Sequence, residues 1–297
     1  MLRIQVPATS ANLGAGFDSL GLAVTLYNQV NIDESEGIFI RSLDEVPVPQ
    51  DGNNLIYKTA KYLFDLCGKP LKGLTIEQVN NIPMARGLGS SSACIVAGLL
   101  GANELMGRPL GEDELLDAAA RMEGHPDNVA PALLGGMVTA VMEEGRVWKV
   151  KQELRDDLSM VAVVPDFELK TADARAALPQ EITLKDGVYN LSRAALMAVS
   201  LANGQYSNLK AACGDRLHQP YRLRLIPGAE AVLDHCRRLG AWCAYLSGAG
   251  STLMALIPSE LSEFPQQLRD YLDLMGLQNW KIHLLHGDNT GARILLQ

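Results

Sequence analysis

The chain has 297 residues and a formal net charge of −8, and 47% of its residues are hydrophobic against 20% that are charged. This balance is typical of a soluble globular protein, and the acidic charge argues against general binding to nucleic acid or to anionic membranes, which need basic surface. A chain of this length is better accounted for by two ordinary domains than by one large core.

Three features of the sequence favour a cytoplasmic location. The five cysteines are scattered and form no Cys-x-x-Cys pair, so neither a zinc ribbon nor a disulfide framework is indicated. The first residues, MLRIQVPATSAN, lack the basic and apolar segments of a signal peptide. The longest apolar run, 129–142, is too short and too rich in glycine to span a bilayer.

Hydrophobic spacing predicts the elements of the first half in chain order. They are strands at 2–6, 20–32, 37–42 and 74–79, helices at 53–67, 92–106 and 112–122, and a hairpin of strands at 135–142 and 147–150. Pro7 is expected to end the first strand, because proline has no N–H to give to a sheet.

The second half shows a different order of elements. It is predicted to hold a strand at 159–164, helices at 188–202 and 228–239, strands at 241–246 and 252–257, a helix at 261–275 and a strand at 280–285. This β-α-β-β-α-β order is the ferredoxin-like arrangement, so the predicted class is α+β. A charged stretch, 151–157, separates the halves, and we predict domains at 1–154 and 155–297.

The stretch PMARGLGSSSA, 83–93, lies between a predicted strand and a predicted helix. Free N–H groups at a helix start attract anions, and glycines let the backbone approach a phosphate. The serine hydroxyls can cap the helix, bind phosphate oxygens or ligate Mg²⁺, so a plain N-cap stays an alternative. The P-loop lysine is absent, and Ser92 stands where a dinucleotide fingerprint needs its third glycine.

Two further segments are rich in glycine. One is PATSANLGAGFDSLGLA near the N-terminus, which also carries Phe17 and the polar pair Asn12 and Asp18. The other is LSGAGSTLMAL, 246–256. Three such segments, widely spaced along the chain, make sense if they converge on one ligand.

The pattern P-x-x-x-G-L-G-S-S-x-A, with both other glycine motifs in this order, resembles the GHMP kinases of small metabolites. Within that family, the homoserine kinases are closely similar over the full set of motifs: PATSANLGAGFD, PMARGLGSSSA, EGHPDNVAPALLGG, KTADARAALP, PYRLRLIPG and SGAGSTL. The resemblance covers essentially the whole chain. It implies a two-domain GHMP kinase fold, in which the N-terminal domain is like domain 2 of ribosomal protein S5 and the C-terminal domain is ferredoxin-like.

The resemblance also implies an activity, the ATP-dependent phosphorylation of L-homoserine to O-phospho-L-homoserine in threonine biosynthesis. A homodimer is compatible with it. The residues implied to bind ATP are Pro83, Met84, Ala85, Arg86, Gly87, Leu88, Gly89, Ser90, Ser91, Ser92 and Ala93. Ser91, or else Ser90, and Glu123 would hold Mg²⁺, although Glu123 also suits a solvated helix end.

HPDN, 125–128, is expected at the end of the helix that carries Glu123. By resemblance, Asn128 occupies the place where mevalonate kinase-like relatives have a catalytic aspartate. Asparagine cannot accept a proton at neutral pH, and the resemblance implies that the substrate hydroxyl passes its proton directly toward the γ-phosphate. Catalysis would then be mostly positioning and charge stabilisation. The resemblance places His125 at the substrate, although a histidine here also suits a structural helix cap.

Homoserine is a zwitterion, so its site needs a cation for the carboxylate and acceptors for the ammonium. Arg175 and Arg222 match the family's carboxylate-binding arginines, with Arg224 as the alternative to Arg222. Asp18, with Asn12 beside it, is the expected partner of the ammonium. The resemblance places Thr171 near the reacting groups, together with Asn128 and Arg175.

Three other functions stay open. A kinase of the same family for another small alcohol, such as mevalonate, is disfavoured by Asn128 and by the two arginines. A ligand sensor that has lost turnover is disfavoured by Glu123 and the loop serines. A nicotinamide-dependent enzyme lacks the third glycine of its fingerprint.

Overall fold

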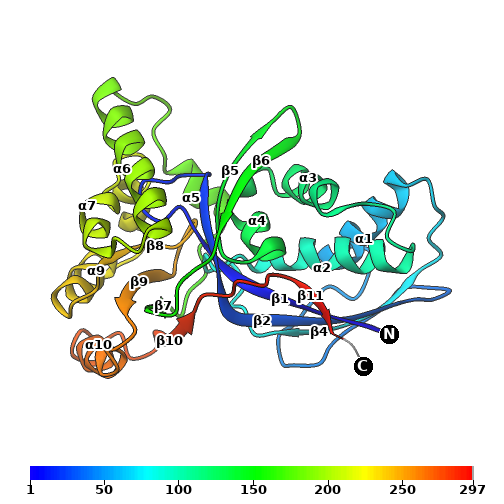
Figure 1. Cartoon of the computed structure of the whole chain (residues 1–297). Coiled ribbons are helices and arrows are strands. Elements are labelled where there is room, and N and C mark those ends of the chain that lie inside the picture. The colour runs from blue at the N-terminus through cyan, green and yellow to red at the C-terminus, as the bar shows by residue number, and fades with distance from the viewer. Residues whose placement is uncertain (296–297) are drawn as a thin grey trace.

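The computed structural model describes residues 1–295, as two β-sheets with helices packed on them (Figure 1). The strands are β1 (Leu2–Ala11), β2 (Leu20–Glu34), β3 (Phe39–Ser42), β4 (Leu74–Asn80), β5 (Met137–Glu143), β6 (Arg146–Gln152), β7 (Leu158–Val164), β8 (Cys243–Leu246), β9 (Leu253–Pro258), β10 (Lys281–His286) and β11 (Arg293–Leu295). The α-helices are α1 (Leu55–Leu66), α2 (Ser90–Leu105), α3 (Glu112–Glu123), α4 (Pro126–Leu134), α5 (Thr171–Ala176), α6 (Leu184–Ala202), α7 (Leu209–Ala212), α8 (Gln219–Arg222), α9 (Ala229–Arg238) and α10 (Phe264–Leu274), and the 3₁₀ turns are η1 (Tyr206–Asn208) and η2 (Leu223–Leu225).

The first sheet has the strand order β11-β1-β2-β4-β3, and the hairpin of β5 and β6 joins it through β2. β2 is its central strand, because it pairs with β1, β4 and β5. Helices α1 to α4 lie together on one side of this sheet (Figure 1). Alternate side chains of β2, such as Leu22, Val24, Val30 and Ile32, are buried in the shared core, as expected for a strand with one apolar face.

The start of α4 lies very close to β2. A Cβ atom at Gly21 would lie 1.7 Å from the carbonyl oxygen of Asp127, so only glycine allows the helix to approach the strand this closely. The sheet therefore fixes the position of the HPDN segment.

The second sheet has the order β10-β7-β9-β8, and all its pairs are antiparallel. This is the strand order of a ferredoxin-like β-α-β-β-α-β unit, so the predicted α+β class is confirmed. Successive residues of β7 point to opposite faces. Val161 and Val163 belong to the core with α9 and α10, whereas Met160 and Ala162 belong to the core that extends to the first sheet.

The structure corrects three expectations about the elements. β1 continues through Pro7 to Ala11, because the pairing with β2 shifts register between Pro7 and Ala8 and so accommodates a residue without an N–H group.

The second correction concerns HPDN, which does not end a helix but begins one. Gly124, at φ 92°, ends α3, and Pro126 is the first residue of α4. All nine residues of α4 are buried, so it has no polar face to give a helical period.

The third correction concerns the end of the described chain. β11 pairs with β1 in the first sheet, so the chain returns there after β10. The domain division at 154 and 155 stays a prediction, but the segment after it is not confined to the second sheet. Within residues 1–295, no helix has both the length and the apolar character needed to cross a membrane.

Candidate active site

The loop 83–93 ends in the start of α2. Gly89 precedes the helix with a left-handed φ of 68°, and α2 begins at Ser90. A Cβ atom at Gly89 would lie 1.9 Å from Oγ1 of Thr9, so the loop needs glycine both for its conformation and for its contact with β1. The free N–H groups and the positive end of the dipole of this 16-residue helix make its start a binding site for anions.

The three glycine-rich segments converge, as the sequence predicts. The hydroxyl of Ser247 donates to the carbonyl of Gly87 at 2.6 Å. The side-chain amide of Asn12 donates to the carbonyl of Gly248 at 2.8 Å. The turn after β8 therefore joins the N-terminal loop to the phosphate-directed loop.

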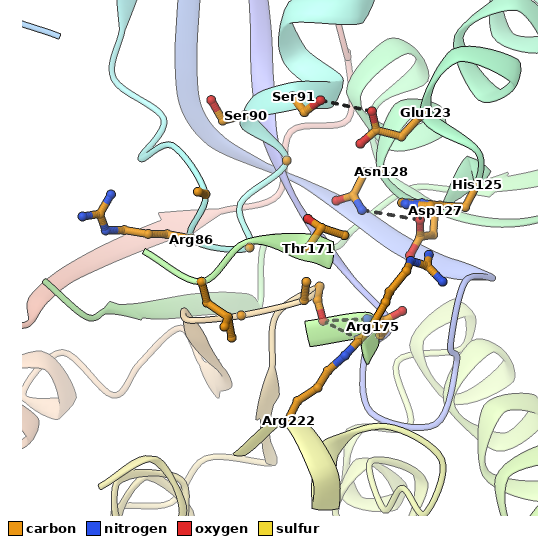
Figure 2. Close-up of a pocket in the computed structure, with 18 of the residues that line it drawn as sticks. Arg86, Ser90, Ser91, Glu123, His125, Asp127, Asn128, Thr171, Arg175 and Arg222 are labelled. Carbon is orange, nitrogen blue, oxygen red and sulfur yellow. Dashed lines mark hydrogen bonds and ion pairs between the residues drawn. The ribbon is translucent and has the colours of Figure 1, made fainter. Parts of the chain in front are cut away.

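A cavity lies where these segments meet (Figure 2). It is lined by every residue that the sequence assigns to substrate, catalysis or metal: Asn12, Asp18, Ser91, Glu123, His125, Asn128, Thr171, Arg175 and Arg222. From the predicted ATP loop it includes Ala85, Arg86, Gly87, Gly89, Ser90 and Ser91. The structure does not bring the other loop residues to its wall, namely Pro83, Met84, Leu88, Ser92 and Ala93.

Arg86 does not act as a substitute for the missing P-loop lysine. Its guanidinium donates to the carbonyls of Pro165, at 3.1 Å, and Met84, at 2.9 Å. In Figure 2 its side chain points away from the loop serines. Arg86 therefore braces the loop, and the backbone is left to bind an anion.

Two serines of the loop hold Glu123. Ser91 donates to Oε2 at 3.2 Å and Ser92 to Oε1 at 2.9 Å, while the hydroxyl of Ser90 points away from the carboxylate (Figure 2). Hydroxyl and carboxylate oxygens are hard donors, and Mg²⁺ in nucleotide sites takes few protein ligands and completes its shell with water and phosphate. Ser91 and Glu123 therefore fit the predicted Mg²⁺ site.

His125, Asp127 and Asn128 lie at the start of α4. Nδ1 of His125 lies 2.5 Å from Oδ1 of Asp127. Burial disfavours the charged form of His125, but the hydrogen bond and the charge of Asp127 outweigh burial, so the pKa of His125 is raised above its ordinary value. The sequence assigned no role to Asp127, although its side chain is buried and lines the cavity.

Asp18, His125 and Asp127 form an acidic corner of the cavity. One ligand atom from each of the three side chains lies within 4.8 Å of the other two, a spacing that a cation can use. Asp18 also accepts a hydrogen bond from Arg175 at 3.0 Å. The residue predicted to bind the substrate's ammonium group and a residue predicted to bind its carboxylate therefore bind each other in this structure.

Arg222 is the buried cation of the site, with 2% of its surface exposed. Its guanidinium donates to the carbonyls of Ala174 and Gly248, both at 3.2 Å, and burial, followed by the charge of Arg175, lowers its pKa to about 10. Arg224 is exposed and packs against Tyr221 instead. The geometry therefore favours Arg222 of the two arginines that the sequence left open.

Sequence reasoning assigned no role to two residues behind Arg222. The imidazole of His218 is fully buried, lies 3.5 Å from Nη1 of Arg222 and contacts the carbonyl oxygen of Gly14 at 2.7 Å. Phe17 lies beneath the guanidinium groups of Arg222 and Arg175, at 5.2 and 5.8 Å from its ring centre. A lone histidine carries no sequence signal for this contact, which joins distant parts of the chain.

One signal at the site is visible only in the backbone. Asn12 and Asp18 have left-handed φ values of 72° and 54°, which are uncommon for residues other than glycine. Such conformations gather at functional sites, where the surrounding structure enforces them.

Comparisons with known proteins bear on the family of the chain. Residues 54–136 match the N-terminal domain model of the GHMP kinases, and residues 197–274 match the C-terminal model. The chain is 48% identical to the homoserine kinase of Clostridium beijerinckii and 45% identical to that of Caldicellulosiruptor saccharolyticus, over 99% of this chain and 99% and 96% of those proteins. The crystal structure of homoserine kinase from Cytophaga hutchinsonii superposes with a TM-score of 0.88 at 28% identity, covering 99% of this chain and 97% of the other.

Proposed function

The chain belongs to the homoserine kinases of the GHMP kinase family, and we propose that it transfers the γ-phosphoryl group of ATP to L-homoserine, forming O-phospho-L-homoserine for threonine biosynthesis. The two-domain fold predicted for this family is confirmed. The observation that carries the proposal is the buried Arg222 beside the pair of Arg175 and Asp18, in the cavity that ends at the phosphate-directed loop.

ATP would bind with its phosphates at the start of α2. A second, mostly apolar cavity adjoins the first and shares Ala85, Ser90 and Ser91 with it. Val48, Leu55 and Asn53 are among the residues that line this second cavity. An apolar slot with a few polar groups suits a flat base, so adenosine would lie there and the triphosphate would pass over the two serines into the site.

Mg²⁺ would be held by Ser91 and Glu123, and when bound it would offset the charge of the β- and γ-phosphates. Ser92 has a supporting task, because its buried hydroxyl keeps one oxygen of Glu123 in place and leaves the other toward Ser91.

The zwitterionic part of homoserine would bind between the two halves of the chain. Its carboxylate would lie against Arg222 and Arg175, and its ammonium would bind to Asp18 with the side-chain oxygen of Asn12 nearby. In the structure Asn12 Oδ1 accepts from the backbone N–H of Asp18 at 3.1 Å, which fixes the loop that carries the carboxylate. The carboxylates of Asp18 and Asp127 favour a cationic group at this end of the cavity.

Phosphoryl transfer would need no carboxylate base. Asp127 is 2% exposed, and its Oδ1 lies 2.5 Å from Nδ1 of His125, so this carboxylate is already engaged by a neighbouring side chain. The acceptor hydroxyl, positioned beside Asn128 and Thr171, would attack the γ-phosphorus while the bond to ADP breaks. Its proton would pass to an oxygen of the transferred phosphoryl group, which balances the step.

Phosphorus NMR tests this reaction directly. With Mg-ATP and L-homoserine, we expect ATP to be converted to ADP and one new phosphate monoester. The matched control is L-2-aminobutyrate, which has the same charged groups but no hydroxyl, and it should give no monoester. A monoester formed from another alcohol but not from homoserine would contradict the proposal.

Three broader expectations accompany the proposal. Mevalonate has a carboxylate but no ammonium group, so Asp18 would have no partner in it, and this acceptor is disfavoured. The cytoplasm, as the place where ATP and free amino acids meet, suits the proposed reaction. A homodimer stays a prediction from the family resemblance.

A further inference from the structure

Thr9 and Asn128 lie 119 positions apart in the sequence but share a buried hydrogen bond. Oγ1 of Thr9 lies 2.8 Å from Oδ1 of Asn128, with Thr9 fully buried on β1 and Asn128 9% exposed on α4. A buried hydroxyl that has a single side-chain acceptor within reach holds that acceptor in one place. Thr9 does not line the cavity, so this contact supports the site from behind.

The direction of the Asn128 amide follows from its two neighbours. Oδ1 accepts from Thr9, and Nδ2 points to Oδ1 of Asp127 at 3.4 Å (Figure 2). If the amide were turned over, its oxygen would face the carboxylate of Asp127, and two acceptors would repel. The carboxylate of Asp127 therefore selects the orientation in which Nδ2 faces Asp127 and Oδ1 faces Thr9, and the hydroxyl of Thr9 holds the amide there by donating to Oδ1. The second N–H of Nδ2 can donate into the cavity that Asn128 lines.

Thr9 also touches the phosphate-directed loop. Its backbone N–H donates to the carbonyl of Leu88 at 3.1 Å, and Oγ1 occupies the space that a Cβ atom at Gly89 would need. One residue of β1 therefore joins the loop proposed for the phosphates to the amide proposed to lie at the reacting atoms.

We propose that Thr9 is a positioning residue for phosphoryl transfer: its hydroxyl fixes Asn128 as a hydrogen-bond donor toward the reacting oxygens and holds it in register with the phosphate loop. The inference rests on the proposed kinase function. It also gives Asn128 a definite task, because an amide held this way donates to oxygen atoms that gain charge in the transition state.

The test compares Thr9→Val, which keeps the shape but loses the hydroxyl, with Thr9→Ser, which keeps the hydroxyl. In the full chain with Mg-ATP and L-homoserine, we expect Thr9→Val to lower kcat by about 10- to 100-fold, the size of effect that a misplaced donor produces, with both KM values nearly unchanged. Thr9→Ser should retain most of the activity. In an Asn128→Ala background, Thr9→Val should have almost no further effect, because the two residues act as a unit.

Three kinetic results would overturn the inference: an unchanged kcat in Thr9→Val, equal losses in the valine and serine variants, or a full additional loss in the Asn128→Ala background. A measurement that does not depend on the acceptor tests the role of Thr9 separately from the proposed function. The side-chain amide signal of Asn128, assigned by its loss in Asn128→Ala, should shift in ¹H–¹⁵N spectra of Thr9→Val and stay near its place in Thr9→Ser. If homoserine were not phosphorylated by the unaltered chain, the proposed function would fail, while an unmoved amide signal would reject the role of Thr9.

Discussion

The guanidinium of Arg175 and the carboxylate of Asp18 bind each other in the cavity, with Nη2 3.0 Å from Oδ1. Their side chains are 39% and 35% exposed, and an ion pair as accessible as this stabilises a protein by only about 0–1 kcal/mol. A zwitterionic amino acid can therefore separate the pair easily and put two ion pairs in its place.

Replacing Asp18 by asparagine keeps the size of the side chain and removes its charge. We expect Asp18→Asn to raise KM for L-homoserine by about 10- to 100-fold, because a hydrogen bond to a charged group contributes about 1.5–3 kcal/mol. KM for ATP should change little. Steady-state kinetics check this, with Asp156→Asn, an exposed aspartate outside the cavity, as the matched control. A loss confined to kcat would argue against a role in binding the ammonium group.

Arg222 and Arg224 provide a matched pair two residues apart. Arg222→Leu should raise KM for L-homoserine by about 10-fold or more through loss of the charge that faces the carboxylate. Arg224→Leu should leave KM unchanged, because its guanidinium lies at the surface beside Tyr221. The opposite order of effects would show that the carboxylate site had been assigned to the wrong arginine.

Glu123 and Ser92 should differ in the size of their effects. Glu123→Ala should lower kcat by at least about 100-fold, because the proposed metal ligand is lost. ATP should still bind to this variant, but with lower affinity. Ser92→Ala should lower kcat by about 10-fold and raise the Mg²⁺ concentration needed for half activity, since it removes only the support of that ligand. Magnesium titrations of both variants measure this, with Glu112→Ala on the exposed start of α3 as control. Near-normal turnover of Glu123→Ala would rule out its assignment.

The contact of His125 with Asp127 should make stability depend on pH. The pKa of His125 is raised in the folded protein above its ordinary value of 6.5, so its contribution is fully present below that value and is lost as the pH rises through the folded pKa. His125→Gln should therefore lower Tm more at about pH 5.5 than at about pH 8.5. Thermal unfolding at both pH values measures the difference, and an equal loss at both would mean that the charge of His125 contributes nothing.

The local chemistry of the site could be predicted from the sequence, because it depends on short segments. Gly87, Gly89 and the serines that follow marked the loop before α2 as a candidate anion site, and the turn at Ser247 has the same kind of composition. The assignment of the loop to ATP came from the family resemblance. The class of the fold followed from hydrophobic spacing. Both rest on neighbours in the chain, where residue type and local conformation are directly linked.

What the sequence could not provide depends on contacts between distant segments. The pair of Asp18 and Arg175 joins positions 157 apart, and the bond of Thr9 to Asn128 joins positions 119 apart. Helix α4 was missed because a fully buried helix has no polar face to mark its period. Which of Arg222 and Arg224 points inward is likewise settled only when η2 and α8 are packed against the rest.

A coupled assay of ADP release with Mg-ATP tests the central claim most directly, with L-homoserine, mevalonate, L-serine and no acceptor compared side by side. We predict rapid release with L-homoserine and background rates with mevalonate and without acceptor. Release driven by mevalonate instead would keep the fold and the nucleotide site but contradict the zwitterion site built from Asp18, Arg175 and Arg222. ATP binding without release for any acceptor would contradict the kinase itself and favour a ligand sensor.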